Sequence, residues 1–204
     1  YDYVKDSASK LNLPIGIDND TLSVKNYNFE GENVELITGQ NIFENNSFIE
    51  SLICEAYDFS DSKVVVIDTK DFIQFSSDKF VLYNSNFENA NEQITNYISS
   101  LNSSTYQSYL FVIIGLDKYK ENIGDEAFDK FTHAMIDSKK LNGINFVIID
   151  ELDTISKFDY DEWYTTCVKT SNFIWIGNGI SEQYHLKINK ISRGMYSEIG
   201  DDFG

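Results

Sequence analysis

Cysteine, histidine and proline are scarce in this sequence of 204 residues, which has two cysteines, two histidines and one proline. Cys54 and Cys167 lie far apart, and neither histidine, at positions 133 and 185, has a second ligand type close by. Zinc sites and disulfide frameworks need clustered, regularly spaced ligands. We therefore predict that this domain holds no metal ion and that both thiols are free, as in a reducing compartment.

Positive charge is scarce as well. Lys and Arg together number 16 against 33 Asp and Glu, the formal net charge is −17, and Arg193 is the single arginine. Affinity for nucleic acids rests mainly on Lys and Arg side chains that neutralise phosphates. The composition therefore predicts that this domain does not bind nucleic acid.

Long apolar runs are missing too. No segment approaches the roughly 20 apolar residues that a membrane-spanning helix needs, so we expect any membrane attachment to lie outside this sequence. The sequence shows no signal peptide and starts with Tyr1 rather than methionine, which suggests a fragment of a longer protein.

What the sequence does contain is a regular alternation of strand-like and helix-like segments. Apolar residues make up 42% and aromatic residues 15% of the chain, which is enough for a well-formed core. Short unbroken apolar runs are typical of strands buried on both faces, and they alternate with segments of helical apolar spacing. The predicted strands cover residues 22–24, 34–38, 64–68, 79–84, 109–115, 145–150, 172–177 and, in short pieces, 184–199; the predicted helices cover 45–59, 87–101, 125–140 and 159–170. This order predicts a single α/β domain over residues 1–204, with a mainly parallel sheet between two layers of helices.

The stretch "LITGQNIFENNSF" (36–48) has the layout of a phosphate-binding loop, because an apolar strand runs into a glycine, a turn and an apolar helix. Ligands of parallel α/β sheets bind beyond the carboxyl ends of the strands, and a helix start attracts anions. A working loop of this kind reads G-x-x-x-x-G-K-[ST], in which the lysine neutralises phosphate charge and the hydroxyl holds magnesium.

The residue types in this loop differ from that pattern. Counting from Gly39 through Gln40 and Asn41 places Glu44 at the second glycine, Asn45 at the lysine and Asn46 at the hydroxyl. A shift of one residue makes Ser47 the magnesium ligand but still supplies no lysine. Since phosphoryl transfer depends largely on electrostatic stabilisation, we expect little or no turnover of magnesium–ATP here.

Two other strand ends carry charged residues. "FVIIDE" (146–151) is an apolar strand that ends in Asp150 and Glu151, with Asp153 close behind. These acids either hold a divalent ion or form a charged helix start, which acids favour. Asp68 and Lys70 follow another strand and either line the same site or lie solvated at the strand end.

Several segments together resemble the FtsK/SpoIIIE-type motor ATPases. "LPIGID" and "YNFEGENVELITG" are similar to their first strands, "VVVIDTK" to the next strand, and "GINFVII" to the strand beyond the second nucleotide motif. "FIWIGNGISEQYHLKI" (173–188) resembles the C-terminal, third ATPase domain of EssC-type proteins of type VII (Ess) secretion. The resemblance implies a P-loop NTPase fold, a three-layer RecA/FtsK-like sandwich.

The resemblance also reassigns the acidic motif. It implies that the magnesium-binding acids belong on "YLFVIIGLDKY" (109–119), where Gly115 and Leu116 stand instead. Both nucleotide motifs would then be degenerate, and no catalytic residue, metal or cofactor is expected in a pseudo-ATPase domain. Two alternatives stay open. One is a weak ATPase in which Asp150 and Glu151 supply the metal site for magnesium and the loop from Gly39 to Ser47 holds the phosphates of ATP without a lysine; the other is a domain that holds ATP without hydrolysing it.

The partners follow from the resemblance alone. It implies substrate recognition or regulation in protein export, with secreted WxG-type proteins and other effectors as substrates. It further implies neighbouring ATPase domains in the same chain, a hexamer in the full-length protein, and a position on the cytoplasmic face of the cell membrane.

Overall fold

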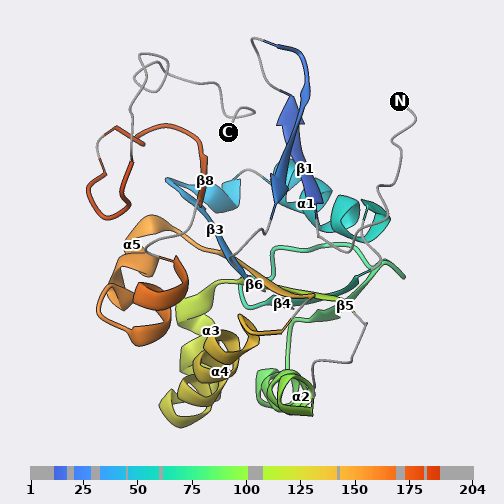
Figure 1. Cartoon of the computed structure of the whole chain (residues 1–204), viewed down its shortest axis with the longest axis vertical. Helices are drawn as coiled ribbons and strands as arrows, with labels where there is room; N and C mark the ends of the chain where they lie inside the picture. The colour runs from blue at the N-terminus through green and yellow to red at the C-terminus, as the bar shows by residue number, and fades with distance from the viewer. Residues whose placement is uncertain are drawn as a thin grey trace.

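A computed structural model describes residues 12–17, 21–28, 33–44, 46–59, 62–100, 108–141, 143–168, 173–181 and 183–188. Its first element is an antiparallel hairpin of β1 (Asn12–Ile17) and β2 (Val24–Asn28), which stands apart from the main sheet (Figure 1). The strand predicted at 22–24 therefore begins later and runs further, because Leu22 has a φ of 51° and belongs to the turn before it.

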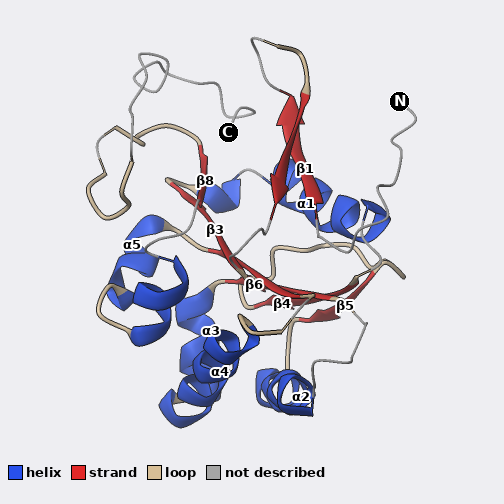
Figure 2. Ribbon diagram, in the orientation of Figure 1, coloured by secondary structure: helices blue, strands red, loops and turns tan. Residues whose placement is uncertain are grey.

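The main sheet has six strands, all parallel, in the order β5-β4-β6-β7-β3-β8 (Figure 2). Their bounds are β3 Val34–Gly39, β4 Lys63–Asp68, β5 Phe80–Tyr83, β6 Tyr109–Ile114, β7 Ile144–Ile149 and β8 Phe173–Ile176. The central strands β3, β6 and β7 are almost wholly buried, which explains their unbroken apolar runs. The predicted parallel sheet is confirmed.

Helices cover both faces of this sheet (Figure 2). One face carries α1 (Asn46–Phe59), and the other carries α2 (Phe87–Ser100), α3 (Leu116–Ile123) and α4 (Asp125–Ser138) with α5 (Leu152–Ile155). Alternate residues of a strand serve the two faces, so Phe146 of β7 packs in the cluster with α4 and Val147 in the cluster with α1. The result is the predicted three-layer α/β sandwich.

Helix α3 was not predicted from the sequence. Its buried residues, Leu116, Tyr119 and Ile123, have helical spacing, but the helix has only eight residues and glycines stand on either side of it. Within the described part of the chain, no helix is both long and apolar enough to cross a bilayer.

The helix predicted at 159–170 is confirmed in part: residues 162–168 are helical and bury Trp163, Cys167 and Val168, whereas 159–161 form a turn and 169–170 lie outside the described residues. Helix α5 and the 3-10 helix η2 (Ser156–Phe158) precede a turn, and a π-helix, η3 (Tyr164–Val168), follows it. Trp163 and Tyr164, at the start of the π-helix, are both buried.

The strands predicted at 184–199 are wrong where they can be compared. Residues 184–188 form an irregular segment in which Leu186 packs into the core and its N–H donates to Gln183 Oε1 at 2.8 Å. Residues 189–199, with Arg193, lie outside the described part of the chain.

Candidate functional site

The carboxyl ends of β3, β4, β6 and β7 lie along one edge of the parallel sheet, with β7 between β3 and β6. Four groups at this edge make up what we call the strand-end site: the loop Gly39–Glu44, Lys70, Gly115 and Asp150. The layout predicted for a phosphate-binding loop is present, since β3 leads through the 3-10 turn η1 (Ile42–Glu44) into α1.

Gly39 is pressed against the neighbouring strand β8. A Cβ atom on Gly39 would overlap the carbonyl oxygen of Ile176 and lie 3.0 Å from its carbonyl carbon. Gly39 thus has a packing reason to be glycine that involves no phosphate.

The rest of the loop is compact. Asn41 has a φ of 54°, and its carbonyl oxygen accepts the N–H of Glu44 at 2.9 Å. Ile42 is buried, and the Phe43 ring packs edge-on against Phe72 with centroids 5.8 Å apart. The loop is therefore held by apolar packing and one turn hydrogen bond.

Polar side chains predicted for the loop point outward or are not described. Gln40, Glu44 and Ser47 are exposed. Asn46 begins α1, and Asn45 lies outside the described residues. The only charged side chain of the described loop is therefore the carboxylate of Glu44.

The space at the end of β6 is filled by side chains of the two residues that follow β4. Gly115 has a φ of 81°, and a Cβ there would overlap Thr69 Oγ1 and lie 2.8 Å from Lys70 Cε. Thr69 Oγ1 donates to the carbonyl oxygens of Ile114 and Gly115 at 3.0 and 2.8 Å. Leu116, the next residue, is 1% exposed and belongs to the core.

Asp68 is neither solvated nor free to bind a ligand. It is 1% exposed; Oδ1 accepts the N–H of Lys70 at 3.0 Å, and Oδ2 accepts the N–H groups of Phe72 and Ile73, each at 2.7 Å. The reading of Asp68 as a solvated strand end is therefore wrong: its buried carboxylate organises the loop after β4, which carries Lys70.

Asp150 is fully buried at the end of β7. Oδ1 accepts the N–H of Glu151 at 2.9 Å, whereas Oδ2 accepts no hydrogen bond of ordinary geometry from the described residues. Burial raises the pKa of Asp150 above its ordinary value, and the Glu151 N–H, the Lys70 ammonium and the N–H groups of Leu116 and Asp117 offset part of this rise. Glu151 is half-buried just before α5, to which it makes no side-chain cap, and Asp153 is exposed.

Replacing Asp150 by asparagine is expected to change how stability depends on pH. Because the folded protein raises the pKa of Asp150, its carboxyl group favours the folded state most when protonated, and that contribution falls as the pH rises through the raised pKa. Urea unfolding from about pH 4 to about pH 7 should therefore show Asp150→Asn gaining stability relative to the parent chain. A difference that stays flat or shrinks would contradict the shift; Asp153→Asn, exposed and nearby, is the control.

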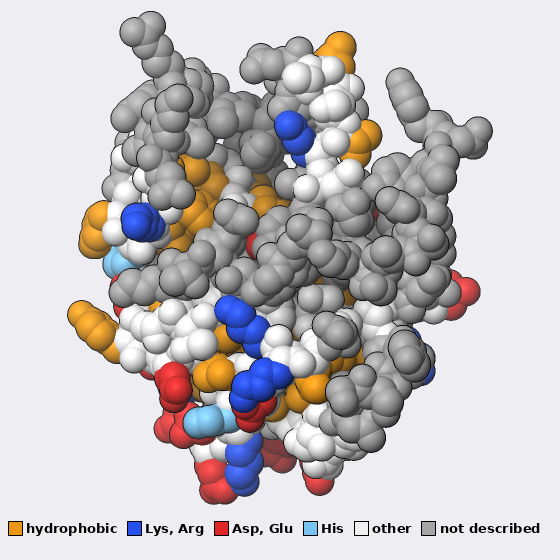
Figure 3. All heavy atoms as spheres, in the orientation of Figure 1, with side chains coloured by type: hydrophobic (Ala, Val, Ile, Leu, Met, Phe, Trp, Pro, Cys, Tyr) orange, Lys and Arg blue, Asp and Glu red, His pale blue; other side chains and the backbone are white. Residues whose placement is uncertain are grey.

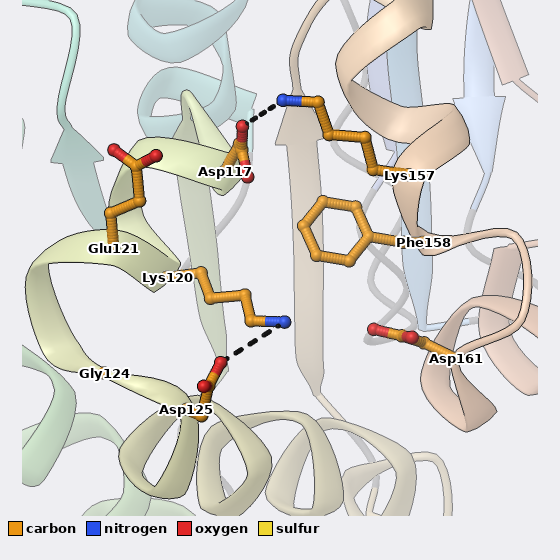
Figure 4. Close-up of a pocket in the computed structure, with 8 residues that line it drawn as sticks. All are labelled: Asp117, Lys120, Glu121, Gly124, Asp125, Lys157, Phe158 and Asp161. Atoms are coloured by element: carbon orange, nitrogen blue, oxygen red, sulfur yellow. Dashed lines mark hydrogen bonds and ion pairs between the residues drawn. The ribbon is translucent and has the colours of Figure 1, made fainter.

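A shallow hollow of about 370 Å³ opens beside the strand-end site, between α3, the start of α4 and the residues around η2. Lys157 reaches across to pair with Asp117, and Lys120 Nζ lies 3.5 Å from Asp125 Oδ1 and 5.7 Å from the Phe158 ring centroid (Figure 4). Glu121, Gly124 and Asp161 complete its lining. Over the corresponding lower part of the face in Figure 3, acidic side chains and lysines are interspersed.

Sequence reasoning did not find this hollow, because it rests on α3, which was not predicted. The signal that could have found it is the apolar spacing of Leu116, Tyr119 and Ile123. Among the described residues, no three or more His, Cys, Asp or Glu side chains are grouped so that they could hold a metal ion.

No protein-family model matches the sequence, and no curated protein matches it. Solved structures do. EssC (ATPases 2 and 3) from Geobacillus thermodenitrificans is 14% identical with a TM-score of 0.68, over 97% of this chain and 39% of that one. Thermomonospora curvata EccC (ATPases 2 and 3), solved in complex with a signal sequence peptide, is 16% identical with a TM-score of 0.61, over 87% of this chain.

The similarity extends to a conjugation coupling protein, pCW3 TcpA with ATPγS, at 11% identity and a TM-score of 0.54, over 80% of this chain and 54% of that one. This chain spans 36% of the EccC structure and 39% of the EssC structure. At these sequence identities the comparison shows similarity of fold alone. That similarity agrees with the six-stranded parallel sheet and its two helical layers. This chain has the P-loop ATPase fold of the type VII secretion domains of EccC and EssC.

Proposed function

We propose that this chain is a domain of a type VII secretion ATPase that recognises exported proteins or regulates their export, and that it does not turn over magnesium–ATP. The observation that carries the proposal is the chemistry of the strand-end site. The described loop after β3 contributes Glu44 and no cation, and Thr69 and Lys70 fill the space beside Gly115 at the end of β6. Such a site fits a magnesium-bound triphosphate poorly, because it supplies neither the loop lysine nor acids at positions 115 and 116.

The partners proposed are secreted proteins of the WxG type and other effectors, together with neighbouring ATPase domains of the same chain. A related solved structure contains a signal sequence peptide, and both it and the EssC structure hold two ATPase domains in one chain. We extend this to a hexamer of the full-length protein on the cytoplasmic face of the membrane. The hollow beside α3, with its exposed carboxylates and lysines, is a surface that polar groups of such a partner can reach.

A second candidate function is a weak ATPase that uses Asp150 and Glu151. What favours it is Asp150 Oδ2, a buried oxygen that accepts no hydrogen bond from the described residues, since a buried polar atom without a partner can mark the place of an ion. When bound, magnesium would neutralise phosphate charge and Asp150 would orient it. An observation against the weak ATPase is that Lys70 already places a positive charge near this carboxylate, which disfavours a magnesium ion there.

Calorimetric titration separates the two functions. The proposal predicts heat of binding when the chain is titrated with a secreted protein of a type VII system, or with its C-terminal signal segment. It predicts no phosphate release from magnesium–ATP above the buffer blank, because the cation that transition-state charge requires is missing from the loop.

The same titration with ATP, with and without magnesium, provides the control. Magnesium-dependent binding of ATP that Asp150→Asn abolishes and Asp78→Asn, at an exposed acid outside the site, leaves intact would support the weak ATPase instead. No binding of any secreted protein of the system, even with the neighbouring domain attached, would overturn the recognition role.

A further inference from the structure

Lys70 takes an unusual path at the strand-end site. Its side chain runs from the end of β4 through the space that Gly115 leaves free, where a Cβ would lie 2.8 Å from Cε and 2.9 Å from Cγ of Lys70. The ammonium then lies over the Phe43 ring, 5.3 Å from its centroid. The positive charge is thus held between the loop after β3 and the end of β6.

The start of this side chain is also fixed. The N–H of Lys70 donates to Oδ1 of the buried Asp68, and Thr69 is tied to β6 by its hydroxyl. Any side chain at position 115 would displace Thr69 or Lys70, so the glycine and the lysine depend on each other. The fold therefore fixes the backbone and the stem of Lys70, although the residue as a whole is exposed.

The carboxylate that the Lys70 ammonium can compensate is that of Asp150. A buried carboxylate is costly unless cations or donors compensate it, and Oδ2 of Asp150 accepts no hydrogen bond from the described residues. Lys70 lies at Gly115, whose N–H donates to the carbonyl oxygen of Ile149, the residue before Asp150, at 3.0 Å, and the nearby Lys157 is already paired with Asp117. Lys70 makes no ion pair within 4.0 Å in the described part of the chain, so its charge is available to Asp150.

We propose that Lys70 is a built-in cation of the strand-end site, which balances Asp150 and keeps divalent metal ions out of the space between the two side chains. The ammonium of Lys70 repels a divalent cation. Its single positive charge balances the single negative charge of Asp150, so no second carboxylate is required at the site. This role does not depend on recognition of an exported protein, and its test uses no such protein.

The test is a double-mutant cycle on the whole chain with Lys70→Met, Asp150→Asn and the double variant. We expect Lys70→Met to lower Tm by about 5 °C, because it leaves a buried carboxylate without its cation. Asp150→Asn should rescue most of that loss, so the two substitutions are not additive. Lys70→Gln replaces Lys70→Met if the latter does not fold.

Adding Mn²⁺ tests whether a divalent ion can bind beside Asp150 once the Lys70 ammonium has been removed. Millimolar Mn²⁺ should leave the parent Tm unchanged, raise the Tm of Lys70→Met, and have no effect on the double variant, since a metal that binds only the folded state stabilises it. Lys118→Met, which removes an exposed lysine of α3, should behave like the parent. Additive effects of the two substitutions, or equal Mn²⁺ responses in the parent and Lys70→Met, would overturn the proposal.

Discussion

Replacing Asp68 by alanine is expected to lower the free energy of unfolding by about 4 kcal/mol. The carboxylate accepts the N–H groups of Lys70, Phe72 and Ile73, and the aspartate is 1% exposed. Each buried donor left without an acceptor costs about 1–3 kcal/mol, and alanine leaves three. Urea unfolding followed by circular dichroism measures the change.

The loss should come from the missing acceptors and not from the missing charge. Asp68→Asn keeps one acceptor oxygen, so it should cost less than alanine. Asp78→Ala, an exposed acid in the segment between β4 and β5, should change stability by less than about 0.5 kcal/mol. A loss below about 1 kcal/mol in Asp68→Ala would show that water replaces the carboxylate at these N–H groups.

The second large effect is expected for Gly39→Ala, at about 3 kcal/mol. The new methyl group would overlap the Ile176 carbonyl oxygen in the paired strand β8, so either β3 or β8 must move. Trp175 reports on this movement, because it is 8% exposed and its indole N–H donates to the carbonyl oxygens of Gly177 and Asn178. We therefore expect a change in tryptophan emission together with the loss of stability.

The neighbouring substitution Gln40→Ala is the control, since Gln40 is exposed. If Gly39→Ala kept the stability and the emission spectrum of the parent, the close approach of β3 and β8 would be wrong. A destabilisation would establish that a glycine at the start of this loop serves sheet packing, whether or not phosphate binds.

The sheet and its two helical layers could be predicted because the signals are local. Unbroken apolar runs mark the strands, and helical spacing marks α1, α2 and α4. Helix α3 was missed because eight residues between two glycines give a weak periodic signal. The helix predicted at 159–170 is present over 162–168, but apolar spacing does not reveal that residues 164–168 are π-helical.

The candidate site was only partly predictable, since its key features join residues far apart in the chain. The sequence places Gly39, Gly115 and Asp150 at strand ends, as observed. It gives no sign that Lys70 fills the space at Gly115, or that Gly39 meets Ile176. The burial of Asp68 and its three N–H partners likewise depends on how the segment after β4 folds back.

The position of β3 in the sheet also bears on how the chain folds. Strand β3 is the earliest strand of the main sheet in the sequence, yet both of its neighbours, β7 and β8, come more than 100 residues later. Strands β4, β5 and β6 pair among themselves over a much shorter stretch. Contacts between distant segments close large loops and form slowly. During synthesis the apolar strand β3 must therefore stay unpaired until β7 has emerged and gains its second neighbour only with β8, so it remains exposed to aggregation longer than β4.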